Sequence, residues 1–405
     1  MTYILKLCAF ASFLSIALGE EIPYEIPREE FYKETPEKEL NFNQFLEKLH
    51  KQINVDIKEK LTEQFKIHED MLNILKKVRK LDACFGFNLD LKGSSIENVK
   101  IGFPDEFDFG LVNQRWTGKI VLLENDKTPP GFGYAVDKDE KTCLKNYLAE
   151  HTKYVDPAKV RGRLRELVAR AMTDLQMDGR IQDIREGGPA VTFEEITPND
   201  RRYPLISIDL AIAIDLRKWP RDARILPPHI MNANAQLVPK VLSEPHTKVW
   251  QISFSKVEKR IMQDIDNDGG CRKKVLQLAK HLKTRAIGQG FFLASYHLKM
   301  TLLHLNNKKK QAEDWKQNKL TDRFVDLINW LLHYLRKGSL PSFFIKGYDL
   351  FKNKPDLRSA IESIKQVIEK MHNDPSFLLP ENDRLQPRHK THHKKSKKRY
   401  YVLNI

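Results

Sequence analysis

The stretch Gly93–Phe109, "GSSIENVKIGFPDEFDF", places a Gly-Ser-Ser turn shortly before two acids that are separated by a single phenylalanine. Residues i and i+2 of a strand point to the same face, so Glu106 and Asp108 are predicted to project together. Two carboxylates a few ångströms apart repel each other by about 4 kcal/mol at an effective dielectric near 20. A cation between the oxygens removes that cost, so the pair indicates a metal site.

A second segment, Leu205–Asp215 "LISIDLAIAID", alternates apolar residues with small or acidic ones over its whole length. This period of two predicts a strand with one buried face and one face bordering a cleft. Asp209 lies on the second face, and we expect it to join Glu106 and Asp108.

Three carboxylates offer the hard oxygen ligands that Mg²⁺ and Mn²⁺ prefer. Two such ions can activate an attacking hydroxyl and stabilise a departing pyrophosphate. Glycine lets the backbone approach a phosphate closely, so Gly93 and Ser94 are predicted to hold its oxygens. An acidic pair alone is common by chance. Gly-Ser, Glu-x-Asp and a distant Asp together are the nucleotidyltransferase arrangement.

The chain around these motifs divides into two lobes. A long helical pattern covers about 41–81, with Leu61, Phe65, Leu72 and Leu75 predicted on its apolar face, and short strands follow from Phe85. Beyond Pro228 the pattern predicts helices near 255–267, 271–285, 291–305, 321–337 and 356–372. We therefore expect an α+β bilobal fold: a spine helix and mixed-sheet core over 41–227, and a helical lobe over 228–375.

The chain carries a net charge of +15, which favours a polyanionic partner. With 41% hydrophobic and 30% charged residues, its composition is that of a globular protein. The basic face of the spine pattern is the candidate polyanion site, although a solvated face gives the same pattern. The candidate residues are Lys76, Lys77, Arg79 and Lys80.

The two ends of the chain differ in composition from its middle. Residues 1–19 combine a basic start, an apolar run and small residues at 17–19, which is the pattern of a signal peptide. Residues 20–40 form an acidic, Pro- and Glu-rich lead-in, and residues 376–405 a basic flexible tail. The chemistry indicates a cytosolic domain, so cleavage of 1–19, a membrane tether and a downstream start all stay open.

The four cysteines, Cys8, Cys84, Cys143 and Cys271, are widely spaced and contain no CxxC pair. This spacing gives no disulfide or zinc framework, and we expect buried or free thiols.

Beyond the acids, the sequence resembles the cyclic GMP-AMP synthase-like receptors, which are Mab-type nucleotidyltransferases. The resemblance covers most of residues 60–352, and its motifs occur in the same order as in that family. They are "GSSIENVKIGFPDEFDF", "GGPAVTF", "ISIDLAIAI", "LVPK", "WQISFSKVEKRI", "CRKKVLQLAK", "SYHLK" and "FFIKGYDLF".

The resemblance implies synthesis of a cyclic dinucleotide from ATP and/or GTP. It assigns two ions to Glu106, Asp108 and Asp209, and the triphosphate to Gly93 and Ser94. Tyr296 would stack on a base, although core packing is the plainer alternative. The remaining implied contacts are Lys280 and Ser295 near the donor phosphates, and Ser253 and Ser255 in the acceptor pocket.

Two departures from the family bear on the expected product and activator. Gln251 stands where the vertebrate synthase has an arginine, and glutamine cannot copy the bidentate fork that reads guanine. The zinc-binding insertion is also missing, since only "DNDGG" (Asp266–Gly270) precedes Cys271. We therefore expect no zinc and a double-stranded nucleic-acid activator such as RNA or DNA. Membrane association and a homodimer on that activator stay open.

Two other functions remain compatible with this sequence. A Mab-type protein can keep the fold as a catalytically silent scaffold or membrane-associated interaction protein. A transferase with the same carboxylates can also extend an RNA end or make linear oligonucleotides. The product distinguishes these from a cyclic dinucleotide synthase.

Overall fold

The structure is a computed structural model that describes residues 26–32, 41–54, 57–102, 105–138, 142–177, 179–196, 205–287 and 293–380. The segments 1–19 and 381–405, together with most of the lead-in over 20–40, lie outside the described residues. None of the helices in these ranges has both the length and the apolar character that a membrane span needs.

A mixed nine-stranded sheet forms the core of one lobe, with strand order β1-β2-β7-β8-β9-β4-β3 and the pair β5–β6 joined to it through β7. The strands are β1 (Asn88–Lys92), β2 (Glu106–Val112), β3 (Ile120–Leu123), β4 (Phe132–Asp137), β5 (Ile181–Gly187), β6 (Ala190–Ile196), β7 (Leu205–Asp215), β8 (Gln236–Val238) and β9 (Trp250–Ser253). β2 and β7 run parallel at its centre, whereas the other pairs are antiparallel.

Strand β7 spans the predicted segment and has the predicted alternation. Ile206, Ile208 and Leu210 are fully buried, whereas Ser207, Asp209 and Ala211 between them stay partly exposed. The apolar face packs into the core, so the acidic face is left open where β7 pairs with β2.

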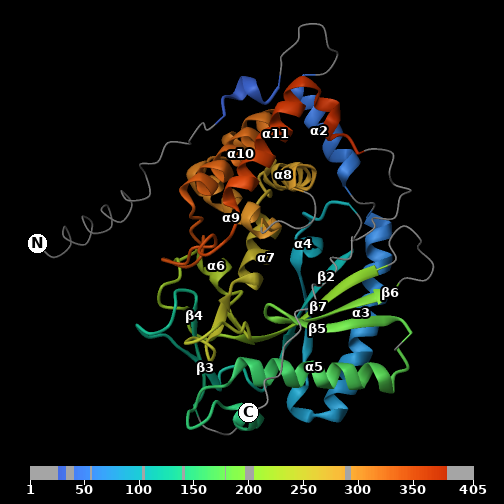
Figure 1. The fold of residues 1–405 in the computed structure, drawn as a ribbon, viewed down its shortest axis with the longest axis vertical. Helices are drawn as coiled ribbons and strands as arrows, with labels where there is room; N and C mark the ends of the chain where they lie inside the picture. Colours follow the sequence, from blue (N-terminus) through green and yellow to red (C-terminus); the bar gives the residue numbers. More distant parts are fainter. Residues whose placement is uncertain are drawn as a thin grey trace, which may run out of the picture.

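Helices α3 (Ile57–Leu81) and α5 (Pro157–Asp174) pack against each other beside this sheet, at the lower end of the molecule in Figure 1. The predicted apolar face of α3 is partly wrong. Phe65 and Leu72 are 71% and 47% exposed, while Leu75 is buried. The buried stripe has the helical spacing of four, three and four residues, and it consists of Ile67, Met71, Ile74 and Val78.

The second lobe is a helical bundle at the upper end of Figure 1, and its helices match the predicted ranges to within a few residues. They are α7 (Ser255–Asp264), α8 (Arg272–Ile287), α9 (Ser295–Lys308), α10 (Leu320–Lys337) and α11 (Leu357–Asn373), with the short α4 (Gly93–Ile96) and α6 (Pro228–Met231) between the lobes. The bilobal α+β architecture is therefore confirmed.

The predicted single helix over 41–81 is two helices. α2 (Phe42–Ile53) starts at an Asn41–Gln44 capping box and packs on α8 and α10, so it contacts the helical lobe rather than the sheet. α3 begins anew at Ile57. Both segments have a helical apolar pattern, so the sequence pattern did not reveal the break between them.

A disulfide joins Cys84 to Cys143, which corrects the expectation of free thiols at these two positions. The two residues are 59 positions apart, in η2 (Ala83–Phe85) directly after α3 and in η3 (Cys143–Tyr147). Only the packing of these two turns against each other brings the sulfurs together, so linear spacing gave no sign of it. Cys271 is a buried free thiol, as expected.

Candidate active site

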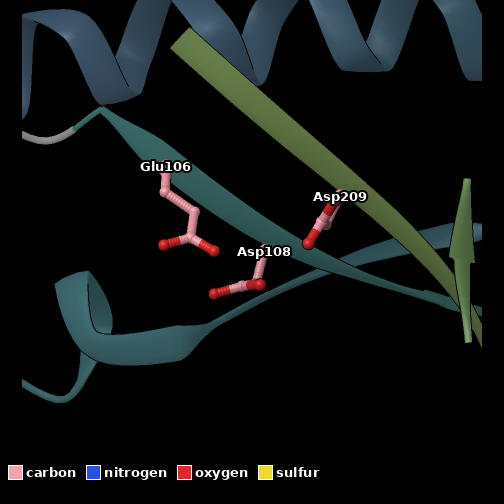
Figure 2. A group of neighbouring side chains, drawn as sticks. All are labelled: Glu106, Asp108 and Asp209. Carbon is pink, nitrogen blue, oxygen red and sulfur yellow. The ribbon is translucent and has the colours of Figure 1, made fainter. Parts of the chain in front are cut away.

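Glu106, Asp108 and Asp209 meet on the open face of the central strand pair. Parallel pairing sets Asp108 directly opposite Asp209, and Glu106 lies two residues earlier on the same face of β2. One carboxylate oxygen from each residue lies within 4.8 Å of the other two. Figure 2 shows the three side chains converging from β2 and β7 above the turn of α4. The sequence prediction of their proximity is confirmed.

The Gly-Ser turn lies directly against this group. β1 pairs with β2 so that Lys92 is opposite Asp108, and the chain then turns into α4 at Gly93. Gly93 has a positive φ of +79°, and a Cβ there would lie 2.0 Å from the Asp108 Oδ2. Only glycine allows this approach. The turn and the carboxylates are therefore parts of one site.

Burial and repulsion disfavour charge on Asp108. Burial, followed by the neighbouring Glu106 and Asp209 carboxylates, raises the pKa of Asp108 to about 7. A cation among the oxygens would reverse these effects. Three mutually close carboxylate oxygens, one of them costly to ionise, fit a divalent hard cation, so these residues could hold Mg²⁺ or Mn²⁺.

Thr192 orients the side chain of Asp209, the third carboxylate, and no local sequence pattern indicated this role. It lies opposite Asp209 on β6, and its hydroxyl donates a hydrogen bond to Asp209 Oδ1. The motif "GGPAVTF" contains this threonine, so the pairing of β6 with β7 was the missing information. The bond orients the carboxylate, leaving Oδ2 for a ligand.

Lys280 contacts the segment that follows the turn. Its ammonium is buried and donates a 2.7 Å hydrogen bond to the Val99 carbonyl. Burial, with Lys100 and Lys299 nearby, lowers the pKa of Lys280 to about 7. Lys280 therefore contacts the segment that follows α4. Contact between Lys280 and the donor phosphates remains a prediction.

A buried charged cluster joins α4, α7 and α9, and the sequence analysis missed it. Lys299 Nζ lies 2.8 Å from Glu97 Oε1 and 2.9 Å from Glu258 Oε2. Glu258 also accepts a 3.3 Å hydrogen bond from the Tyr296 hydroxyl. Glu97 follows α4 directly, so the cluster holds the turn against the helical lobe.

The side chain of Tyr296 is 37% exposed even though its hydroxyl is bonded to Glu258. It is therefore not a closed core tyrosine, and a base could contact its ring. Ser295, at the start of α9, is partly buried. Their nucleotide contacts stay predictions.

The predicted acceptor residues adjoin one another. Ser253 and Ser255 have their hydroxyl oxygens 3.3 Å apart, and Ser255 donates to Gln236 Oε1 at 3.3 Å. Gln251, two residues before Ser253 on β9, donates a 3.4 Å hydrogen bond to the Tyr348 hydroxyl. These neutral groups lie on the side of the sheet that carries Asp209, because Asp215 pairs with Gln236 and Gln236 pairs with Ser253.

The candidate polyanion residues lie on the last turns of α3. Lys76, Arg79 and Lys80 are exposed, whereas Lys77 is partly buried and forms a 2.9 Å ion pair with Asp174 of α5. Among the described residues, no hydrogen bond or ion pair connects them to the three carboxylates. They form a separate surface, and its role stays a prediction.

Comparison with known proteins agrees with this geometry. Residues 95–264 match the Mab-21 protein nucleotidyltransferase domain, and residues 271–370 match the Mab-21 protein HhH/H2TH-like domain. The chain is also 24% identical over 339 residues to the cyclic GMP-AMP synthase of Mus musculus. That match covers 74% of this chain and 64% of the mouse protein, so the chain spans somewhat under two thirds of the relative's length. The chain belongs to the Mab-21 family of nucleotidyltransferase-fold proteins and is a cyclic GMP-AMP synthase-like member of it.

Proposed function

We propose that this protein is a metal-dependent nucleotidyltransferase that joins ATP and/or GTP into a cyclic dinucleotide second messenger. The observation that carries this proposal is the approach of Gly93 to Asp108 beside Glu106 and Asp209. A catalytically silent scaffold would gain nothing from three carboxylates that repel one another. It would also gain nothing from a glycine whose missing Cβ lets the turn lie against Asp108. The likeness to the mouse synthase favours a cyclic product over a linear one.

In the proposed reaction a ribose hydroxyl of one nucleotide attacks the α-phosphorus of the other. The new O–P bond forms as the bond to pyrophosphate breaks, and a second, equivalent step closes the ring. Two Mg²⁺ or Mn²⁺ ions held by the three carboxylates would lower the charge on the reacting oxygens. The backbone at Gly93 and Ser94 would hold the triphosphate. Asp209, with Oδ1 engaged by Thr192, would offer Oδ2 to the hydroxyl or a cation.

Activation by double-stranded RNA or DNA on α3 is part of the proposal. Lys76, Arg79 and Lys80 are exposed on its last two turns. Such a surface binds backbone phosphates rather than base edges, so binding should fall steeply with salt and depend little on sequence.

We also propose that the domain folds in an oxidising compartment. Cys84 and Cys143 are joined although Cys143 is exposed, and cytosolic reductants would reach such a bond. The signal-like pattern of residues 1–19 agrees with export. Protease protection of a tagged protein, with and without residues 1–19, tests this: a tag digested in intact, unpermeabilised membranes contradicts it.

The product assay tests the proposed function. Purified protein is incubated with labelled ATP and GTP, Mg²⁺ or Mn²⁺, and no polymer, double-stranded DNA or double-stranded RNA. We expect a phosphatase-resistant dinucleotide in one polymer lane and none from the Glu106→Ala/Asp108→Ala variant. Phosphatase-sensitive oligonucleotides would indicate a linear transferase, and folded protein that is inert in every lane would indicate a scaffold.

A further inference from the structure

The outward face of α3 carries two large apolar side chains. Phe65 and Leu72 are both exposed, and Phe65 keeps 71% of its surface in contact with solvent. They are seven residues apart, close to two full helical turns, so they lie on one face of the helix. The buried stripe of α3 lies on the opposite side, where the helix packs against α5 and η2. The apolar pair is therefore central on the face that the described part of the protein leaves uncovered.

Basic side chains continue this face towards the end of the helix. Lys76 follows Leu72 by four residues, Arg79 follows it by seven, and Lys80 follows Lys76 by four. Each of these spacings keeps two residues on the same side of a helix. All three cations are exposed, and within the described residues no hydrogen bond or ion pair engages them. They are free to bind an anionic ligand.

The other charges of this segment do little to neutralise the three cations. Lys77 and Asp70 are paired within the protein, at 2.9 Å from Asp174 and 2.6 Å from Arg180. Glu69 is the only acid that the described part of this face exposes. The face is therefore apolar in its first half and positively charged in its second.

A nucleic-acid duplex accounts for the cations but not for the apolar pair. Its outer surface is a phosphate backbone, which binds Lys and Arg. Phenylalanine or leucine contributes to duplex binding only when it wedges between base pairs in the minor groove.

A bilayer with anionic headgroups has a use for both kinds of side chain. Phe and Leu enter the boundary between headgroups and acyl chains, while Lys and Arg reach the lipid phosphates beside them. A single exposed apolar side chain is common on soluble proteins. Two on one helix face, followed by three unpaired cations, form the pattern of a helix that lies in a membrane interface.

We propose that the outward face of α3 is a docking surface for an anionic phospholipid bilayer, with Phe65 and Leu72 inserted and Lys76, Arg79 and Lys80 on the headgroups. This inference goes beyond the proposed function, because it assigns a second ligand to the protein and needs no catalytic step. A duplex and a bilayer would use the same three cations, so each should exclude the other.

The surroundings of position 65 test the inference directly. Para-fluorophenylalanine would replace Phe65 in the full chain, and its fluorine NMR signal would be recorded with vesicles of phosphatidylcholine containing about a third phosphatidylserine. A lipid with a nitroxide near the top of its acyl chain broadens the signal of an inserted side chain. We expect the signal to be lost at position 65 and kept when the label replaces the exposed Ile225. Vesicle-bound protein that keeps the signal at position 65, or protein that does not bind these vesicles, would overturn the inference.

This readout concerns one side chain, so it is independent of any membrane contact made by residues 1–19. Affinity measurements then separate insertion from charge. Phe65→Ser/Leu72→Ser should weaken vesicle binding about tenfold or more at an unchanged melting temperature, because both side chains are exposed. Glu69→Gln should strengthen it about fivefold, since one opposing charge is gone. Ile225→Ser is the matched control, and equal weakening by this variant would count against a specific face.

Duplex binding distinguishes the two ligands. Phe65→Ser/Leu72→Ser should bind double-stranded RNA or DNA as the wild type does, and added duplex should displace the wild type from vesicles. A variant that loses duplex binding but keeps vesicle binding would assign the apolar pair to a nucleic-acid groove and overturn the inference. Protein that inserts at position 65 but releases no pyrophosphate would support the inference and count only against the proposed function.

Discussion

The Lys299 ammonium lies 2.8 Å from the Glu97 carboxylate, so helix α9 is joined to the residue that directly follows the Gly93–Ile96 turn. Both side chains are largely buried, with exposed fractions of 13% and 3%. Although burial opposes its charge, Glu258 and Glu97 raise the pKa of Lys299. Lys299 therefore stays charged, and its ion pair with Glu97 links the helical lobe to the turn beside the three carboxylates.

Lys299→Met should lower the free energy of unfolding by about 3 kcal/mol, because it leaves Glu97 and Glu258 buried without their cation. Chemical denaturation measures this. Glu97→Gln in the same background removes one uncompensated charge and should restore part of the loss. Additive effects of the two substitutions would show that Lys299 and Glu97 are not coupled.

Metal affinity should depend on pH through Asp108. Its raised pKa of about 7 means that the metal-free site holds a proton below that pH, and a divalent cation must displace it. The apparent affinity for Mn²⁺, measured by calorimetry, should therefore rise about tenfold from pH 6 to pH 8 and then level off. Asp209→Asn removes one repelling charge, so any residual binding should shift its midpoint to lower pH. A flat profile from pH 6 to pH 8 would refute the role of Asp108.

The disulfide should contribute to stability. Closing 59 residues between Cys84 and Cys143 restricts the unfolded chain by about 4 kcal/mol in the loop-entropy estimate. Cys84→Ser/Cys143→Ser should lower the melting temperature, and a reductant should do the same to the wild-type protein only. Mass spectrometry of unreduced peptides should find the two cysteines linked. Both thiols free in protein freshly purified without reductant would contradict the pairing.

Charge reversal on α3 tests the polyanion surface. Lys76→Glu/Lys80→Glu should weaken binding to double-stranded RNA or DNA and flatten its dependence on salt, because fewer counterions are released. Both residues are exposed, so folding should be unaffected. Lys127→Glu, an exposed lysine of another loop, is the matched control. Equal weakening by the control would mean that only net charge matters.

Much of the site could be predicted from local pattern. The alternation in 205–215 fixed the face of Asp209, and the spacing in Glu-Phe-Asp fixed that of Glu106 and Asp108, because a strand has a strict period of two. The five later helices followed from apolar periodicity in the same way.

The features that local pattern did not reveal depend on contacts between distant segments. Thr192 and Lys299 acquire their roles only through the pairing of β6 with β7 and through the ion pair that joins α9 to the residue after α4. The Cys84–Cys143 bond has the same origin. Phe65 and Leu72 were misplaced because α3 carries apolar residues on more than one face, and only the packing partner selects the face that is buried.

The central claim is that the three carboxylates perform nucleotidyl transfer, and one comparison tests it most directly. Pyrophosphate release from ATP and GTP with Mn²⁺ and double-stranded RNA or DNA would be measured for the wild-type protein and for Asp209→Asn, beside their melting temperatures without metal. We expect the variant to lose about a hundred- to a thousandfold in rate, as expected for a lost charge-stabilising group. It should also melt no lower than the wild type, because a repelling charge is gone. A folded variant that releases pyrophosphate at the wild-type rate would contradict the account.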